Sequence, residues 1–286
     1  MQNILTKFFF KTISKGKLEK IFSYLENLYP DGQDPWGLNL KKTKVNFAII
    51  WPFYKSYFKT RVFGKKNVPN GPVMVISNHS GQIAIDGMLI SSAFVGDIWP
   101  PRILRPMVER FFTNLPFVGN WAAEGGAALG DRQNCEQLLQ RKQSVLVFPE
   151  GVKGVAKSTP DYYKLQKFTR GFLRIAIKTK TEILPIAVIG AEEFYPFVYQ
   201  AKKLAKLLGF PALPLSPSFI LGPIGFIPLP SPVDIHIGKP YTIPENLTHK
   251  STDRELDIHI DKIHQEIKDL LKMGLKKRRK FWANQK

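Results

Sequence analysis

The 286 residues are 44% hydrophobic and include one cysteine, so the chain is long enough to bury a full core and cannot form an internal disulfide. The formal net charge of +19 is concentrated at the two ends: residues 1–70 hold 13 basic and 4 acidic side chains, and residues 272–286 hold 7 basic and no acidic ones. No zinc-ligand spacing, basic zipper or RNP-like aromatic motif is present, which argues against a nucleic-acid binder. Basic ends interleaved with large aromatic residues favour an anionic membrane surface as the partner.

Residues 4–15 predict a basic amphipathic helix. In a helix, Lys7, Lys11 and Lys15 fall on one narrow face, while the phenylalanines at 8–10 spread around the rest. Such a helix suits the interface of a bilayer, and the alternative is a terminal helix that packs its phenylalanines on the domain. Lysines interrupt the apolar run and no small-residue cleavage site follows, so the segment is not typical of a signal peptide.

The next segments predict a helix, a turn and an aromatic stretch. Residues 18–28 have a helical pattern that ends at the turn-forming residues 29–32. Residues 45–57 are aromatic and flanked by lysines, but they are shorter than the roughly 20 apolar residues that a transmembrane helix needs, and they contain Pro52. We therefore expect this stretch to lie along a membrane rather than cross it, and a short strand to follow over residues 58–63.

A histidine follows the first strongly apolar strand. Residues 73–76 are apolar, rich in β-branched side chains and flanked by turn formers, which predicts a buried strand. This strand delivers Asn78 and His79 to its carboxyl end, where ligands bind in an open α/β sheet. Asp86 is the only carboxylate between residues 71 and 96, so His79 and Asp86 are candidates for a base and its orienting carboxylate. The alternative is an ordinary turn cluster.

Arg132 follows a passage of small residues that allows close backbone approach. Residues 115–130 are rich in glycine, and a helix is predicted over 134–142. An arginine near a helix N-terminus suits an oxyanion or phosphate, and an ordinary surface arginine is the alternative. Before this passage we predict a helix over 88–95, a strand over 102–105 and a helix over 108–113.

A second buried strand is predicted over residues 144–148, and it also ends in polar and glycine residues. Glu150, Gly151 and Lys153 follow it directly. Parallel strands bring their carboxyl ends to one edge of a sheet, so the two strands predict a shared cleft and an α/β fold. Glycine lets backbone amides face an anion there, and Lys153 adds a positive charge.

The second half of the chain predicts further sheet and helix. The basic residues of 162–180 suit lipid headgroups, an acidic carrier protein or the phosphates of coenzyme A, and a solvated helix face is the alternative. Residues 207–233 are uncharged but hold seven prolines, which excludes a regular transmembrane helix and favours extended segments. We predict strands over 182–189, 219–221 and 233–237, and helices over 193–208 and 253–271. His259 and His264 lie too far around the last helix to share a metal ion.

Four ordered sequence blocks resemble those of the glycerolipid and lysophospholipid acyltransferase family. The blocks are Asn78-His79 with the following Asp86, residues 126–132, residues 148–151, and residues 184–188. The match runs from about residue 63 to residue 241, and the third block is its most specific part. Within the family, the chain is most similar to the branch that includes monoacylglycerol- and diacylglycerol-acyltransferase-like proteins.

The resemblance implies a single acyltransferase domain, with a central, mostly parallel sheet flanked by helices, and a role for each site residue. His79 would be the general base and Asp86 its partner. The implied substrate-binding residues are Asn78, Arg132, Glu150, Gly151 and Lys153. We expect membrane-associating amphipathic helices in residues 1–60, the acyltransferase domain in 61–245, and a C-terminal helix with a basic tail in 246–286.

Two departures from the family pattern bear on these roles. Six residues separate His79 from Asp86, where the usual first block has four, although Gly81 would let the extra residues loop out. Lys153 stands where the third block usually has arginine; lysine keeps the charge but loses the bidentate fork that suits a phosphate.

By this resemblance, the chain is expected to transfer a fatty acyl group from acyl-CoA or an acyl carrier protein to a hydroxyl of a glycerolipid or lysophospholipid. We expect no metal and no cofactor beyond the thioester co-substrate, and a location on the cytoplasmic face of a membrane with an anionic leaflet. Acylation of a neutral glyceride is one alternative, and a catalytically inactive relative that binds lipid is another. The sequence lacks the Gly-x-Ser-x-Gly, P-loop and His-Glu-x-x-His motifs, which argues against a serine hydrolase, a nucleotidase and a metalloprotease.

Overall fold

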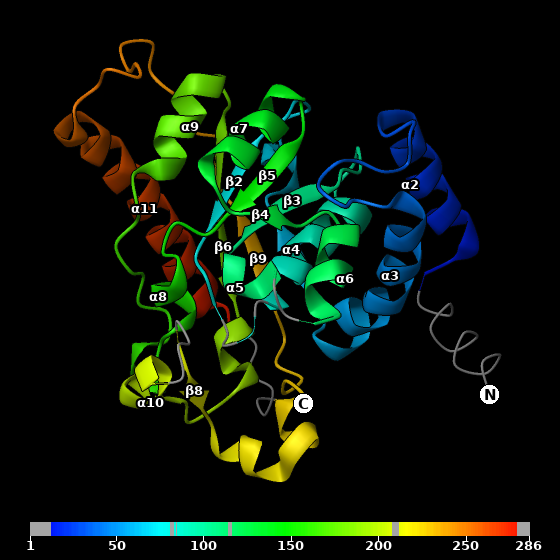
Figure 1. The fold of residues 1–286 in the computed structure, drawn as a ribbon, viewed down its shortest axis with the longest axis vertical. Helices are drawn as coiled ribbons and strands as arrows, with labels where there is room; N and C mark the ends of the chain where they lie inside the picture. Colours follow the sequence, from blue (N-terminus) through cyan, green and yellow to red (C-terminus); the bar gives the residue numbers. More distant parts are fainter. Residues whose placement is uncertain (1–12, 81–82, 84, 114–115, 208–211, 279–286) are drawn as a thin grey trace.

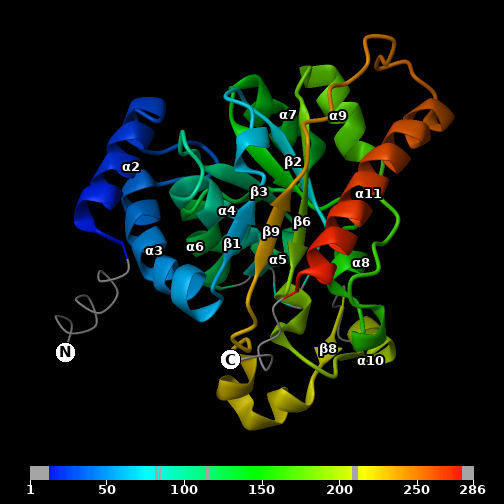
Figure 2. The same cartoon turned by 180° about the vertical axis from the view of Figure 1, so that it is seen from behind.

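The computed structural model describes most of the chain, with helices on both faces of a central sheet (Figures 1 and 2). Residues 1–12, 81–82, 84, 114–115, 208–211 and 279–286 are not described. The predicted helix over 4–15 therefore lies almost entirely outside the described residues, as do the aromatic residues of the C-terminal tail. The prediction of an α/β fold with a central, mostly parallel sheet is confirmed.

The elements have the following bounds. The strands are β1 Arg61–Phe63, β2 Met74–Ser77, β3 Leu104–Val108, β4 Ala128–Leu129, β5 Ser144–Val147, β6 Ile183–Ile189, β7 Tyr199–Gln200, β8 Pro214–Leu215 and β9 Asp234–Ile237. The α-helices are α2 Lys15–Leu28, α3 Leu40–Pro52, α4 Ile85–Gly96, α5 Arg110–Thr113, α6 Val118–Glu124, α7 Arg132–Gln140, α8 Val152–Val155, α9 Gly171–Thr179, α10 Lys202–Leu207 and α11 Asp253–Lys276. A π-helical turn, η1 Phe53–Tyr57, extends α3, and the 3-10 segments are η2 Lys65–Asn67, η3 Thr159–Asp161, η4 Ala191–Phe194 and η5 Pro217–Phe226.

The strand order in the described part of the sheet is β1-β9-β6-β2-β5-β3-β4. β6, β2, β5, β3 and β4 are all parallel, whereas β9 runs antiparallel to β6 and carries β1 with it. β2 lies between β5 and β6 in the middle of the sheet. The residues that follow β2 and β5 therefore emerge side by side at one edge.

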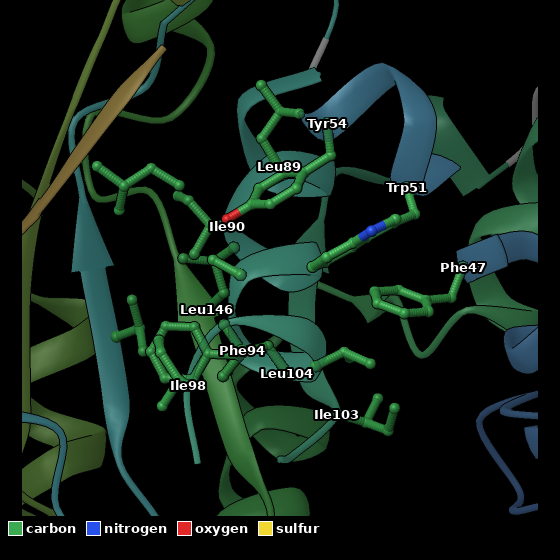
Figure 3. Packing of buried hydrophobic residues seen from close by; sticks show 14 of the residues in the cluster. Phe47, Trp51, Tyr54, Leu89, Ile90, Phe94, Ile98, Ile103, Leu104 and Leu146 are labelled. Atoms are coloured by element: carbon green, nitrogen blue, oxygen red, sulfur yellow. The ribbon is translucent and has the colours of Figure 1, made fainter. Parts of the chain in front are cut away.

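Both faces of the central strands are covered by helices. In β2, Val75 faces the helices α2, α3 and α4, while Met74 and Ile76 face α7, α9 and α11, and all three side chains are fully buried. Such burial on two sides explains the continuous apolar runs by which these strands are recognised in the sequence. Figure 3 shows the first of the two cores, in which residues of α3 and η1 point toward α4.

The aromatic stretch 45–57 forms part of this core, so its expected position along a membrane holds for at most one face. Trp51 is 2% exposed and packs between Phe47 and Tyr54 (Figure 3). Trp51 lies in the stretch expected along a membrane, but the period of the helix turns it toward α4 and into the core. Val45 and Ile49, on the opposite face of α3, are exposed.

Two predicted elements of the second half differ from the structure. Within the helix predicted over 193–208, only α10 is α-helical, and the first half holds the end of η4 and the strand β7. Residues 219–221 do not pair with the sheet and instead lie in η5. The last helix is longer than predicted and begins with a capping box between Thr252 and Glu255. Among the described residues, no helix has both the length and the apolar character needed to cross a membrane.

Candidate active site

Asn78 fixes the chain as it leaves β2. Its side-chain amide donates a hydrogen bond to the Val188 carbonyl at 3.0 Å, and its amide oxygen accepts one from the Val188 N–H at 2.8 Å. Asn78 is 1% exposed. Its two hydrogen bonds to the Val188 backbone continue the pairing of β2 with β6 beyond the end of β2. These two bonds set the direction in which His79 enters the space beyond the sheet edge.

His79 and Asp86 are in direct contact. His79 Nδ1 lies 2.8 Å from Asp86 Oδ2, despite the six intervening residues. Asp86 is fully buried in the first turn of α4, and its carboxylate also accepts hydrogen bonds from the backbone N–H groups of Ser80 at 2.7 Å and Gly87 at 2.8 Å. These donors and the positive end of the helix dipole stabilise the ionised carboxylate. The extra residues of this block include positions 81, 82 and 84, which are outside the description.

The contact with Asp86 determines which ring nitrogen of His79 is available. Since Nδ1 faces the carboxylate, Nε2 is on the opposite side of the ring. The ring stacks on Phe148, with centroids 4.0 Å apart and planes inclined by 13°, and its side chain is 13% exposed. The imidazole is thus fixed on one face by Phe148 and at one nitrogen by Asp86, and it borders a cavity.

A buried charge network holds the loop that carries His79. Glu150 accepts hydrogen bonds from the His79 N–H at 2.8 Å and from the Gln166 N–H at 2.7 Å. Lys157 Nζ lies 3.3 Å from Glu150 Oε2 and 3.0 Å from Glu192 Oε1, and it donates to the His79 carbonyl at 3.3 Å. Burial raises the pKa of Glu192 to about 7, against the opposing effect of Lys157. Both backbone polar groups of His79 are therefore bound to this network.

Two glycines make room for this arrangement. A Cβ on Gly154 would lie 2.6 Å from the Cβ of His79 and 2.9 Å from that of Glu150, closer than side chains pack. Gly151 has φ 57° and ψ −148°, a conformation that only glycine adopts readily, and it is the N-cap residue of the short helix α8. The backbone of α8 can therefore approach His79 closely.

An apolar cavity of about 460 Å³ opens beside His79. It extends between α4, β3 and α6 to α3, and this volume lies in the range of small-molecule sites, roughly 300–1,000 Å³. Met88, Phe148 and Val152 line it near His79, whereas Asn46 and Ser91 line it where α3 meets α4. A buried nitrogen of Asn46 and the hydroxyl of Ser91 have no hydrogen-bond partner among the described residues. A long apolar group fits the cavity better than a charged one.

Comparison with known proteins agrees with this geometry. A family model for acyltransferases, described simply as "Acyltransferase", matches residues 59–189. An uncharacterised protein of Mycobacterium tuberculosis is 35% identical over 245 residues, which cover 83% of this chain and 68% of that protein. The chain belongs to the lipid acyltransferase family. This acyltransferase has its His79 and Asp86 within the segment that the family model covers.

More distant relatives include proteins whose names state an activity. A mouse protein named "DGAT1/2-independent enzyme synthesizing storage lipids" is 24% identical, over 80% of this chain and 65% of its own length. A 1-acyl-sn-glycerol-3-phosphate acyltransferase of Chlamydomonas reinhardtii is 25% identical, over 52% of this chain and 43% of its own. The crystal structure of the 1-acyl-sn-glycerophosphate acyltransferase PlsC from Thermotoga maritima aligns with a TM-score of 0.54 at 19% identity, covering 99% of this chain and 98% of that one. The fold of this acyltransferase is therefore that of PlsC.

The two predicted cationic residues lie outside the His79 cluster. Arg132 is exposed at the start of α7, after β4, and β4 is separated from β2 by three strand spacings, about 14 Å. Lys153 is exposed on α8, close in sequence to Gly151, which lines the cavity. Both residues follow strands, β4 and β5, whose carboxyl ends lie at the same sheet edge as that of β2.

Sequence reasoning missed Lys157 and Glu192. Their importance comes from burial and from contacts that span 35 residues between the two, and no local pattern distinguishes them from surface charges. Among the described residues, no group of three or more histidine, cysteine, aspartate or glutamate side chains is arranged to hold a metal ion. His259 instead bonds to the hydroxyl of Tyr241.

Proposed function

We propose that this acyltransferase moves a fatty acyl group from a thioester, acyl-CoA or acyl carrier protein, to a hydroxyl of a glycerolipid or lysophospholipid. The observation that carries the proposal is the His79–Asp86 pair at the mouth of an apolar cavity. The pair supplies a base with an oriented ring, and the cavity offers a water-poor site for an acyl chain. The name of the C. reinhardtii relative supports an acylglycerol phosphate as the acceptor.

The proposed chemistry needs no acyl-enzyme. With Nδ1–H held by Asp86, Nε2 of His79 accepts the proton of the acceptor hydroxyl as its oxygen attacks the thioester carbonyl carbon. The tetrahedral intermediate collapses by breaking the carbon–sulfur bond, and the imidazolium returns the proton to the leaving thiolate. Asp86 stabilises the imidazolium in between. The products are an ester and a free thiol, and His79 is restored.

The roles of the neighbouring residues follow from their contacts. Glu150 and Asn78 have their polar atoms bound to backbone groups, which supports positioning rather than direct substrate binding. We propose that Glu150 positions the His79 loop, and that Lys157 positions both Glu150 and this loop. The exposed Arg132 and Lys153 remain the residues proposed to bind a phosphate or headgroup of the acceptor.

Two classes of acceptor are candidates, an acylglycerol phosphate and a neutral glyceride. Lysine in place of arginine at position 153 and the name of the mouse relative favour a neutral glyceride as the second candidate. Purified protein should be given both thioester donors with lysophosphatidate and with monoacylglycerol, and the products identified by mass spectrometry. With a phosphorylated acceptor, Arg132→Ala and Lys153→Ala should raise its KM far more than that of a neutral one. Equal effects would favour the neutral glyceride, and no donor-dependent ester from any pair would favour an inactive relative.

We also propose that the enzyme works at the cytoplasmic face of a membrane with an anionic leaflet, where its acceptor resides. The basic ends support this, with Lys276 and Lys277 exposed at the end of α11. Arg278 does not join them, because it is paired with Glu193 at 2.7 Å and donates to the Ser231 hydroxyl, also at 2.7 Å. Of the basic side chains in the tail from residue 272, Arg278 is therefore bound to the domain.

A further inference from the structure

The exposed apolar side chains of this protein gather in one region. Of the 24 large hydrophobic residues that are exposed in the described chain, eleven fall within residues 197–229. Ile220 is 88% exposed, Ile224 70% and Leu221 67%. Together with them, the region comprises Phe197, Tyr199, Leu204, Leu207, Leu215, Phe226, Ile227 and Leu229, and we call these eleven residues the apolar rim. A concentration of exposed apolar side chains in one segment is typical of an interaction site.

The apolar rim is held in place by its own inward contacts. Phe219 stacks on Phe226, with centroids 4.5 Å apart, and packs edge-on against Tyr195. The Tyr195 hydroxyl donates to the Phe226 carbonyl at 2.6 Å, and the Tyr57 hydroxyl donates to the Pro228 carbonyl at 2.7 Å. The segment is thus anchored to the core while Ile220, Leu221 and Ile224 point away from it.

The rim lies next to the active site. Figures 1 and 2 both place η5, β8 and α10 at the end of the molecule beyond the sheet edge, with α8 between this end and the sheet. Ala212 and Pro214, between α10 and η5, line the same cavity as His79. A ligand that contacts the rim is therefore adjacent to the cavity that we assign to the acyl chain.

The charges around the rim select its partner. Residues 207–233 contain no acidic or basic side chain, and Lys203 and Lys206 are exposed beside them on α10. Asp234, the first carboxylate after the segment, is buried and paired with Arg61. An uncharged apolar face flanked by lysines matches the interfacial layer of a bilayer, with acyl chains below and anionic headgroups around.

We propose that the apolar rim is a membrane-docking surface that enters the interfacial layer of an anionic bilayer and sets the cavity mouth at the depth of the lipid acceptor. The role of the rim in presenting the lipid acceptor rests on the proposed function, whereas the case for docking rests on the exposed residues and charges described above. It names a contact distinct from the basic ends, and one that salt does not screen. The 3-10 turns of η5 satisfy some of its backbone hydrogen-bonding groups. If the rim enters only the interfacial layer, water can still reach the remaining polar groups of the backbone.

Cosedimentation of the full chain with vesicles tests the proposal. The vesicles are phosphatidylcholine alone, or equal parts of phosphatidylcholine and phosphatidylglycerol, at low and high salt. In Ile220→Ser/Ile224→Ser we expect the partition coefficient to fall by about ten-fold at both salt concentrations, because apolar area is lost. Trp99→Ser/Ile258→Ser removes exposed apolar side chains from the segment after α4 and from α11, outside the rim, and should bind as the unaltered protein does.

The remaining outcomes separate this proposal from the function. The rim variant should acylate a detergent-dispersed acceptor at the normal rate and lose rate only on vesicles. If the unaltered protein shows no acyl transfer but the rim variant still loses vesicle binding, the function fails and the docking surface stands. Unchanged vesicle binding by the rim variant overturns the proposal. A concentration-dependent dimer that the rim substitutions abolish, without vesicle binding by the unaltered protein, also overturns it and assigns the rim to a second copy.

Discussion

Lys157→Met removes a buried cation that links the His79 loop to two buried carboxylates. The lysine side chain is 3% exposed, lies 3.0 Å from Glu192 and 3.3 Å from Glu150, and donates to the His79 carbonyl. Methionine fills the space of the stem without the charge. Breaking a buried ion pair from one side costs about 3–5 kcal/mol, and we expect the lower end because Glu192 can take up a proton in the variant.

Urea unfolding at pH 7.5 measures this cost. Lys157→Met/Glu192→Gln also removes one of the two carboxylates that Lys157 pairs with, so it should recover part of the loss and remain folded. Lys164→Met is the matched control, because Lys164 is exposed and its only ion pair with a described residue is with Asp161 at the surface, worth less than about 1 kcal/mol.

Activity gives an independent measure of the same role. Loss of the Lys157 contact frees the His79 carbonyl, so kcat should fall by about ten- to a hundred-fold in the folded double variant, with a smaller change in KM. If Lys157→Met loses less than about 1 kcal/mol relative to Lys164→Met, and the double variant keeps normal kcat, the charge network does not position the base.

Three further changes have defined outcomes. Gly154→Ala places a Cβ 2.6 Å from that of His79, so kcat should collapse while far-UV circular dichroism stays normal; normal turnover would show that α8 need not approach the base. Because the pKa of Glu192 is raised, the folded state keeps a proton that the unfolded state releases between pH 4.5 and 7. The free energy of unfolding should therefore fall by up to about 3 kcal/mol over this range. In urea titrations, Glu192→Gln should flatten this pH dependence. Lys276→Gln/Lys277→Gln should weaken cosedimentation with anionic vesicles at low salt by about 1 kcal/mol per residue, and no effect would remove α11 from the docking account.

The central sheet and its polar edge were predictable because their signals are local. Strand β2 is buried on both faces, so it appears as an unbroken apolar run, and Asn78 and His79 follow it without interruption. The same holds for β5 and Glu150. Once the strands are parallel, topology alone brings these residues to one edge.

The parts that could not be predicted depend on contacts between distant segments. Lys157 and Arg278 resemble surface cations in the sequence, yet each is buried by acidic partners far along the chain. The helix predicted over residues 193–208 fails in its first half because β7 pairs with β8, a partner fourteen or more residues away. Trp51 is a residue type common at membrane interfaces, but its position on α3 faces the core.

The rate of ester formation by His79→Ala tests the central claim most directly. The variant should first be shown by urea unfolding and vesicle cosedimentation to keep its fold and its membrane binding. Product formation, followed by mass spectrometry with the donor and acceptor that the unaltered protein prefers, should then fall by about 10²–10⁴-fold, because the general base is gone. Asp86→Asn should lose a large part of the rate as the ring orientation is released. Near-normal turnover by folded His79→Ala would contradict the proposed mechanism.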